Sequence, residues 1–322
     1  MKQTKIMETH LLLIALWLLT FGNIARAQNN FDALDSLAMT FQKDSFPTHN
    51  ALAMALVKNC STDRDKARMI FTWIAKTVRY DWHKYLTGDK TFAIPYGKTL
   101  DEKQKEFAAK TYRGSKGICM DYSLLFREMC QSVGVECLYI EGQTRHASGF
   151  FRKWESHAWN AVKIDDKWQL IDVTWASGYI NGGQFHRKFS DGYFFTPPEL
   201  FVLDHFPNEE KWQLLAQAVD KQSFKSQPTI NYALGDWAIS AFEPKNGKLV
   251  ATANGAQQIR LHFVEKPPAY ITLKAGSSYL QVIRKDTPDG WTTLTFNRNG
   301  SSDVLLGVGK SKNFFTIMGQ FE

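Results

Sequence analysis

The chain is poor in cysteine, with four cysteines in 322 residues, and no two of them are spaced as CxxC. A disulfide scaffold, a zinc knuckle and a thioredoxin-like redox site are therefore not expected. Cys130 lies on the apolar stripe of a predicted helix and Cys137 in an apolar strand, so we interpret both as small buried hydrophobic residues. A disulfide is the alternative for these two and for Cys60, because exported proteins can pair their cysteines.

Basic clusters and long apolar runs are also absent. The formal net charge of +7 is spread over many lysines, so a nucleic-acid partner is not expected. No run of about 20 apolar residues is present to span a membrane. The apolar run Leu11–Phe21 and the small-x-small site Ala25-Arg26-Ala27 instead predict a secretory signal peptide over residues 1–27, cut after Ala27. We expect a secreted or periplasmic protein with no stable membrane anchor after cleavage; an uncleaved anchor is the alternative.

Residues 28–222 have the pattern of an α+β domain. Helical spacing of apolar residues predicts helices over 31–59, with a break at Pro47, over 67–78, and from Cys119 to a glycine cap at Gly134. Apolar runs then predict strands at 135–140, 158–164 and 168–175. Helices followed by an antiparallel sheet are typical of α+β proteins.

The last hundred residues differ in character. Glycine and proline turns separate short segments that alternate or run apolar, which is typical of a small all-β sandwich. We predict this C-terminal β domain at residues 223–322, with a linker at 223–228.

Cys119 is a candidate nucleophile because it lies where a predicted helix begins, directly after Gly117-Ile118. A thiol attacks only as its thiolate, and a free cysteine with a pKa of about 8.5 is mostly protonated at neutral pH. The unpaired N–H groups and the dipole at a helix N-terminus stabilise an anion. The position therefore favours a reactive thiolate, with a buried structural cysteine as the alternative.

His157 and Asp172 lie on two consecutive predicted strands. If their turn has two residues, both side chains point to one face and come within hydrogen-bonding reach. A histidine there can take the thiol proton and later return it, and an aspartate can hold the ring in one tautomer. The spacing predicts a Cys119–His157–Asp172 triad. Its oxyanion hole would use the Cys119 N–H and, as a second candidate, the indole N–H of Trp82.

Three blocks around these residues resemble the transglutaminase-like superfamily, which has a papain-like fold: GIC at 117–119, HAWN at 157–160 and WQLIDVTW at 168–175. The later segments YF at 193–194, HFP at 205–207 and WQLL at 212–215 are similar to its kyphoscoliosis-peptidase-like branch. The resemblance implies that Cys119 is the nucleophile, His157 the base and Asp172 the orienting acid. We interpret His205 as structural, because neither a strand nor an acidic partner is predicted for it.

The resemblance also implies acyl transfer from an amide or peptide bond through a Cys119 thioester, without a cofactor. The acidic loops of the calcium-dependent crosslinking enzymes are missing, so no metal is expected. Water as acceptor would make the protein a peptidase or amidase acting on a protein, a peptide or a cell-wall peptide. We favour hydrolysis because an exported enzyme meets abundant water. The alternatives are a protein-crosslinking transglutaminase and a non-catalytic protein-interaction module.

Overall fold

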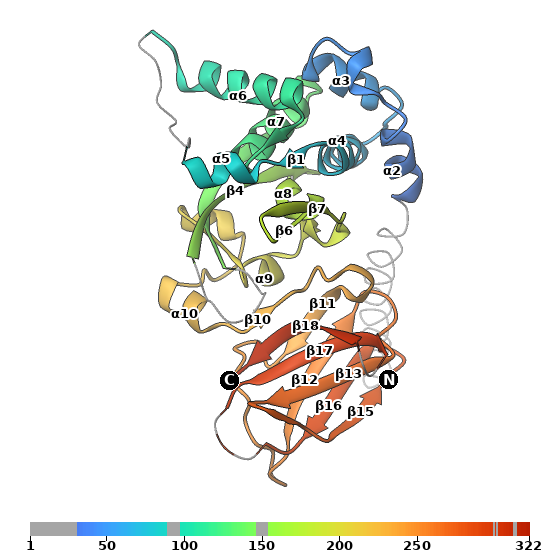
Figure 1. Cartoon of the computed structure of the whole chain (residues 1–322), viewed down its shortest axis with the longest axis vertical. Coiled ribbons are helices and arrows are strands. Elements are labelled where there is room, and N and C mark those ends of the chain that lie inside the picture. The colour runs from blue at the N-terminus through green and yellow to red at the C-terminus, as the bar shows by residue number, and fades with distance from the viewer. Residues whose placement is uncertain (1–30, 89–96, 146–153, 299, 301, 312–313) are drawn as a thin grey trace, which may run out of the picture.

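The structure is a computed structural model that describes residues 31–88, 97–145, 154–298, 300, 302–311 and 314–322. An α+β part occupies the N-terminal two thirds of the chain and β-sheets form the C-terminal part (Figure 1). The predicted signal peptide lies outside the described residues. Among the residues that are described, no helix is both long enough and apolar enough to cross a membrane.

The helices described in the α+β part lie around several hydrophobic clusters, the largest of which is lined by all of them except those at residues 82–87 and 198–201. They are α2 (Asp32–Ala38), α3 (His49–Leu56), α4 (Asp63–Thr77), α5 (Trp82–Thr87), α6 (Leu100–Gly114), α7 (Cys119–Ser132), α8 (Val173–Ser177) and α9 (Pro198–Phe201). Thr48, Thr62 and Thr99 cap α3, α4 and α6 by accepting a hydrogen bond from a backbone N–H of the first turn. Gly134, with φ of 80°, follows α7 as expected. The predicted helices are confirmed.

One five-stranded antiparallel sheet, ordered β8-β5-β4-β3-β9, completes this part. Its strands are β3 (Cys137–Arg145), β4 (Trp154–Ile164), β5 (Lys167–Ile171), β8 (Phe194–Thr196) and β9 (His205–Pro207). Two small pairs flank it: β1 (Arg79–Tyr80) with β2 (Lys116–Gly117), and β6 (Gly178–Asn181) with β7 (Gln184–Arg187). Short 3-10 turns occur at η1 (Lys43–Ser45), η2 (Asp191–Tyr193), η3 (Glu210–Gln213) and η4 (Gly235–Trp237).

The turn between β4 and β5 has two residues, as the triad prediction required. Asp165 and Asp166 have φ of 47° and 61°, and the ladder pairs Ile164 with Lys167 and Asn160 with Ile171. The strand predicted for residues 168–175 is too long, however, because β5 ends at Ile171. The carboxylate of Asp172 accepts hydrogen bonds from the next backbone N–H groups and starts α8 instead.

The segment predicted as a linker, residues 223–228, is largely helical. Helix α10 (Lys221–Ser226) is capped by Asp220, whose carboxylate accepts the Ser223 N–H at 2.6 Å. Phe224 is fully buried, with ring centroids 5.1 Å from those of Trp154 and Phe206. The segment is therefore anchored to the α+β part. Before it, residues 210–213 form only the short turn η3.

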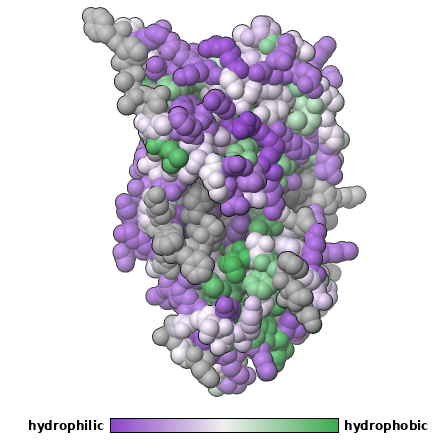
Figure 2. Space-filling view, viewed as in Figure 1, coloured by the Kyte–Doolittle hydropathy of each residue, from purple (hydrophilic) through white to green (hydrophobic). Residues whose placement is uncertain are grey.

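The C-terminal part consists of two antiparallel sheets, ordered β10-β18-β17-β13-β14 and β11-β12-β16-β15. Their strands are β10 (Thr229–Ile230), β11 (Ile239–Glu243), β12 (Gln257–Phe263), β13 (Tyr270–Ala275), β14 (Ser278–Tyr279), β15 (Val282–Asp286), β16 (Trp291–Phe296), β17 (Val304–Ser311) and β18 (Phe314–Phe321). Apolar side chains of both sheets share one core, so the predicted α+β protein with a C-terminal β-sandwich is confirmed. Figure 2 shows hydrophobic side chains exposed on this part and mainly hydrophilic ones over the helices.

Gly142 in β3 is required by packing, which leads to a first prediction. A Cβ atom there would overlap the carbonyl oxygen of Phe206 and the ring of Trp159. We expect Gly142→Ala to lower the free energy of unfolding by about 1–3 kcal/mol, measured by urea denaturation. Gly114→Ala is the matched control, because a Cβ atom there meets only Lys116 at 3.9 Å. Equal stability of the two variants would contradict the packing argument.

Candidate active site

Cys119 lies at the first residue of α7 and is 8% exposed. The carboxylate of Asp121 reaches back to the Ile118 N–H at 2.8 Å and forms an ion pair with Lys84 at 2.7 Å. A Cβ atom on Gly117 would overlap Asp121, so only glycine fits directly before this turn. These contacts fix the start of α7 and therefore the direction of the thiol.

Polar contacts hold α7 against β4 next to His157. Ser123 donates to the carbonyl of Ala158 at 3.0 Å, and Asn160 donates to the carbonyls of Ser123 and Leu138, both at 3.0 Å. The side chain of Asn160 is completely buried, so these bonds are shielded from water. The helix that begins with Cys119 is thus tied to the strand that carries His157.

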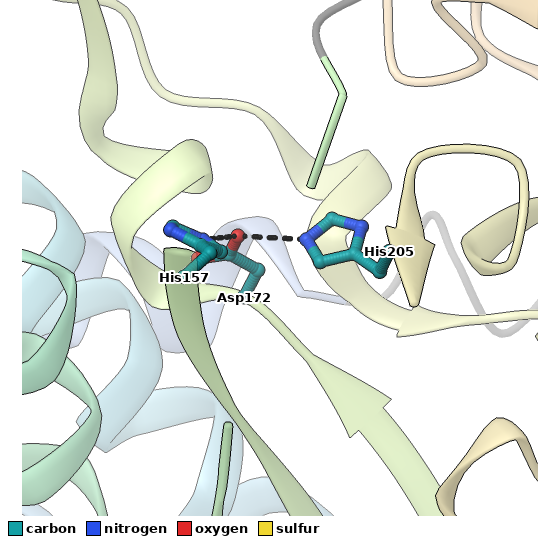
Figure 3. Close-up of side chains that lie close together, drawn as sticks. All are labelled: His157, Asp172 and His205. Carbon is teal, nitrogen blue, oxygen red and sulfur yellow. Dashed lines mark hydrogen bonds and ion pairs between the residues drawn. The ribbon is translucent and has the colours of Figure 1, made fainter. Parts of the chain in front are cut away.

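His157 and Asp172 are in direct contact, as the sequence predicted. The His157 Nε2 atom lies 2.7 Å from Oδ2 of Asp172 (Figure 3). The other oxygen, Oδ1, accepts the N–H groups of Thr174 at 2.8 Å and Trp175 at 3.0 Å. The ring of His157 is also close enough to Cys119 for that thiol to raise its pKa. Because Nε2 faces the carboxylate, Nδ1 is the nitrogen left for the thiol.

The electrostatics of the site favour charged forms of both partners. Burial lowers the pKa of His157, but the charges of Asp172 and Cys119 and the hydrogen bond to Asp172 outweigh this and raise the pKa to about 10. Burial raises the pKa of Asp172, but the charge and hydrogen bond of His157, with smaller contributions from His205, hold it below its usual range. An imidazolium and a carboxylate therefore lie side by side at neutral pH.

The prediction that His205 has neither a strand nor an acidic partner is wrong. His205 begins β9, which pairs with β3, and its Nε2 lies 3.1 Å from Oδ2 of Asp172. Its Nδ1 lies 2.5 Å from Asp204. Sequence reasoning missed this because β9 has only three residues, although the adjacent Asp204-His205 pair was a signal.

Trp82 begins α5 rather than lying in a loop. Backbone bonds between β1 and β2, extended by Asp81 N–H to Gly117 carbonyl at 2.9 Å, bring its segment beside the start of α7. Its ring stacks on that of Tyr85 with centroids 5.1 Å apart, and its indole nitrogen lies beside Gly183. These contacts neither require nor oppose an oxyanion role, which stays a prediction.

A cavity of about 540 Å³ is lined by Leu100, Glu141 and Trp212, among others, and by none of the candidate triad residues. Tyr139 also lines it, and this residue is close enough to Cys119 for the thiolate charge to raise its pKa, second to the effect of burial and of Glu141. One residue of the cavity lining is therefore within electrostatic range of the candidate nucleophile.

The other three cysteines are free thiols in the structure. Cys130 and Cys137 are completely buried, and burial raises the pKa of Cys130 well above its usual value. Burial also raises the pKa of Cys60, which is only partly exposed. Raised pKa values suppress the thiolate, so these two cysteines are poor nucleophiles at neutral pH.

His157, Asp172 and His205 place possible metal-ligand atoms within 4.8 Å of one another. The ring nitrogens, however, are 2.7 and 3.1 Å from the same carboxylate oxygen. Both distances are those of hydrogen bonds, and all three side chains are nearly or fully buried. The donor set is already satisfied by its own hydrogen bonds.

Comparison with known proteins identifies the class. Residues 50–173 match the family model of the transglutaminase-like superfamily. A solved structure described as a TGase aligns with a TM-score of 0.29 at 22% identity, over 50% of this chain and 35% of that one.

The chain is also similar to several distant homologues, at 24–28% identity. Kyphoscoliosis peptidase is 28% identical in mouse over 66% of this chain and in human over 65%, and in each case 31% of the relative is covered. Hillarin of Drosophila melanogaster is 24% identical over 72% of this chain and 29% of its own length. The chain thus spans about a third of the length of these relatives.

The raised pKa of His157 leads to a second prediction. Because its folded-state pKa of about 10 exceeds the ordinary 6.5, the protonated ring contributes to stability below pH 6.5, and this contribution is lost as the pH rises through about 10. Asp172→Asn removes the main raising charge, so we expect the pKa of His157 to fall by about one to three pH units. An NMR titration of the ring measures it.

Asp220→Asn is the control, because it removes an exposed carboxylate that caps α10. It should leave the His157 titration unchanged. A titration of His157 near 6.5 in the unsubstituted protein would refute the electrostatic description of the site.

Proposed function

We propose that this protein is an exported cysteine acyl-transfer enzyme that acts on amide or peptide bonds through a thioester, with Cys119 as nucleophile, His157 as base and Asp172 as orienting acid. One observation carries the proposal: the ring of His157 is hydrogen-bonded to Asp172 and is close enough to Cys119 for that thiol to raise its pKa. The match to the transglutaminase-like superfamily supports the same reaction class.

The first half of the proposed reaction forms the thioester. His157 and Cys119 react as an imidazolium–thiolate pair, and the thiolate attacks the carbonyl carbon of the amide. The oxyanion is stabilised by the backbone N–H of Cys119 at the start of α7, with the indole N–H of Trp82 as the second donor. His157 gives its Nδ1 proton to the leaving amine, and the carbon–nitrogen bond breaks.

The second half returns the enzyme to its starting state. His157 takes a proton from the acceptor, which attacks the thioester and displaces the Cys119 thiolate. Water as acceptor makes the protein a peptidase or amidase. The word peptidase in the names of the mouse and human relatives supports this form. A protein or peptide, including a cell-wall peptide, is the proposed substrate.

Export is part of the proposal and rests on the leader-like residues 1–27. The site suits either an oxidising or a reducing compartment, since its chemistry needs only one free thiol, Cys119. N-terminal sequencing of the protein recovered from the culture medium or periplasm tests cleavage after Ala27. Recovery in the cytoplasm with an intact N-terminus would contradict export while leaving the chemistry untouched.

A working thiolate–imidazolium pair should be visible without a substrate. We expect iodoacetamide to alkylate Cys119 rapidly well below pH 8.5, the ordinary thiol pKa. His157→Ala should slow this reaction and move its pH profile upward, because the counter-charge of the thiolate is lost. Peptide mapping by mass spectrometry identifies the labelled thiol.

Cys60→Ala is the matched control, because Cys60 is the most exposed of the other cysteines. It should leave the rapid phase unchanged. An ordinary thiol profile that His157→Ala does not alter would refute the triad and favour a non-catalytic interaction module.

The acceptor can be identified from the products. We incubate the protein with a casein substrate, and separately with purified cell wall, each with a labelled primary amine. We expect new chain ends without amine incorporation, and a loss of roughly 10²–10⁴-fold in rate for Asp172→Asn, as for the aspartate of other triads. Amine incorporation would establish crosslinking instead. Turnover that survives Cys119→Ala would refute the thioester.

A further inference from the structure

His205 occupies a position that the triad chemistry does not use. It is completely buried between two acidic side chains, with Nε2 3.1 Å from Oδ2 of Asp172 and Nδ1 2.5 Å from Oδ1 of Asp204. Figure 3 shows the rings of His157 and His205 on opposite sides of Asp172, each joined to the same carboxylate oxygen. Asp172 therefore has two histidine partners.

The two contacts decide the protonation of His205. A neutral imidazole has one N–H donor and one nitrogen lone pair. If only one nitrogen carried a proton, the lone pair of the other would face an acid at hydrogen-bonding distance, which is repulsive as long as that acid is ionised. Burial lowers the pKa of His205, but the charge of Asp204 and the hydrogen bonds to both acids outweigh this and raise it. Both ring nitrogens are donors.

The surrounding charges balance this buried imidazolium. Burial raises the pKa of Asp204, and this rise is opposed by His205, by the hydroxyl of Tyr232, which donates to Asp204 at 3.0 Å, and by the charge of Arg145. Beside the neutral thiolate–imidazolium pair, the cluster thus holds two acids, Asp172 and Asp204, and two cations, His205 and Arg145. Such a balance is what permits charges in a site without water.

The orientation of His205 is fixed by aromatic packing. The ring stacks on that of Phe201, with centroids 3.8 Å apart and planes at 19°. Trp175 and Trp159 cover it from other directions, with centroids at 4.6 and 5.1 Å. The ring is therefore held against Asp172 in one orientation.

The contacts that run from Asp172 through His205 and Asp204 end at Tyr232 in the C-terminal part. Tyr232 follows β10, is 2% exposed and belongs to the core of the C-terminal sheets. Nearby, Arg145 donates to the carbonyls of Gln227 and Pro228 at 2.9 and 2.8 Å, and Ser190 donates to the carbonyl of Ala233 at 2.9 Å. The β part is thus connected to the buried acid cluster at several points.

We propose that His205 is a positioning residue for the triad: held doubly protonated by Asp204, it donates to Asp172 and keeps that acid an oriented carboxylate. The inference rests on the proposed function, because it assigns His205 to the same site. It adds a second histidine, which acts through Asp172 and does not touch the substrate.

The test removes the charge of Asp204 with little change in shape. In Asp204→Asn, His205 loses its main raising charge and with it one ring proton, so Asp172 loses a charged donor. The pKa of Asp172 then rises. The acidic limb of the pH profile, where the Cys119 alkylation rate falls as the pH is lowered, should therefore shift to higher pH by about one to two units. The measurement compares the pH profiles of the Cys119 alkylation rate in Asp204→Asn and in the unsubstituted protein.

Tyr232→Phe is the matched control. It removes the other hydrogen bond to Asp204 but keeps the carboxylate, so His205 should stay doubly protonated and the acidic limb should not move. If the cluster served only to join the two parts of the fold, both variants would lower the melting temperature and neither would shift the limb. That result would overturn the proposal.

A direct measurement needs no activity. In the unsubstituted protein labelled with ¹⁵N-histidine, His205 should show two protonated ring nitrogens at pH 7, and in Asp204→Asn only one; His205→Gln assigns the signals. A single protonated nitrogen in the unsubstituted protein would overturn the proposal even if alkylation were fast. Slow alkylation of Cys119 beside a doubly protonated His205 would instead refute the proposed function alone.

Discussion

The candidate site depends on one buried carboxylate, that of Asp172. Four donors satisfy it: two backbone N–H groups of α8 on Oδ1, and the rings of His157 and His205 on Oδ2. An unpaired carboxylate with no exposed surface would cost several kcal/mol, so the arrangement of β5, α8 and β9 has to supply these donors. The end of β5, the start of α8 and the first residue of β9 therefore lie around the carboxylate of Asp172.

The same constraint explains how distant segments are joined. Cys119 reaches His157 because Ser123 and Asn160 hold α7 against β4, and the two-residue turn at Asp165-Asp166 sets the register that places Asp172 beyond its end. Each of these is a polar contact in or beside an apolar core, where hydrogen bonds are strong and leaving one unmade is costly. The geometry of the site therefore follows from the polar contacts that hold α7, β4 and β5 together in or beside the core.

The C-terminal sheets also contact the residues around this buried site. A β-sandwich attached by a free linker would have no influence on the site, yet α10 is packed through Phe224 on the α+β part, and Tyr232 donates to Asp204. Burial of the Asp204 carboxylate raises its pKa, and the hydroxyl of Tyr232 is one of the groups that lower it. The β part thus contributes to the electrostatics around the candidate triad as well as to the fold.

Periodicity along the chain was sufficient to predict the helices, the β4–β5 hairpin and the contact between His157 and Asp172. Helix period, turn length and strand alternation are local properties of the sequence. The end of β5 at Asp172 was missed since strand alternation continues past it, and only the capping bonds stop the strand. His205 was misjudged because β9 is too short to have a period. Its partner Asp172 is 33 residues away, and Tyr232, which donates to the neighbouring Asp204, is 28 residues from that acid. The sequence alone determined the types of element and the candidate nucleophile, base and acid; tertiary structure alone decided the second histidine and its charge, because burial and long-range contacts set both.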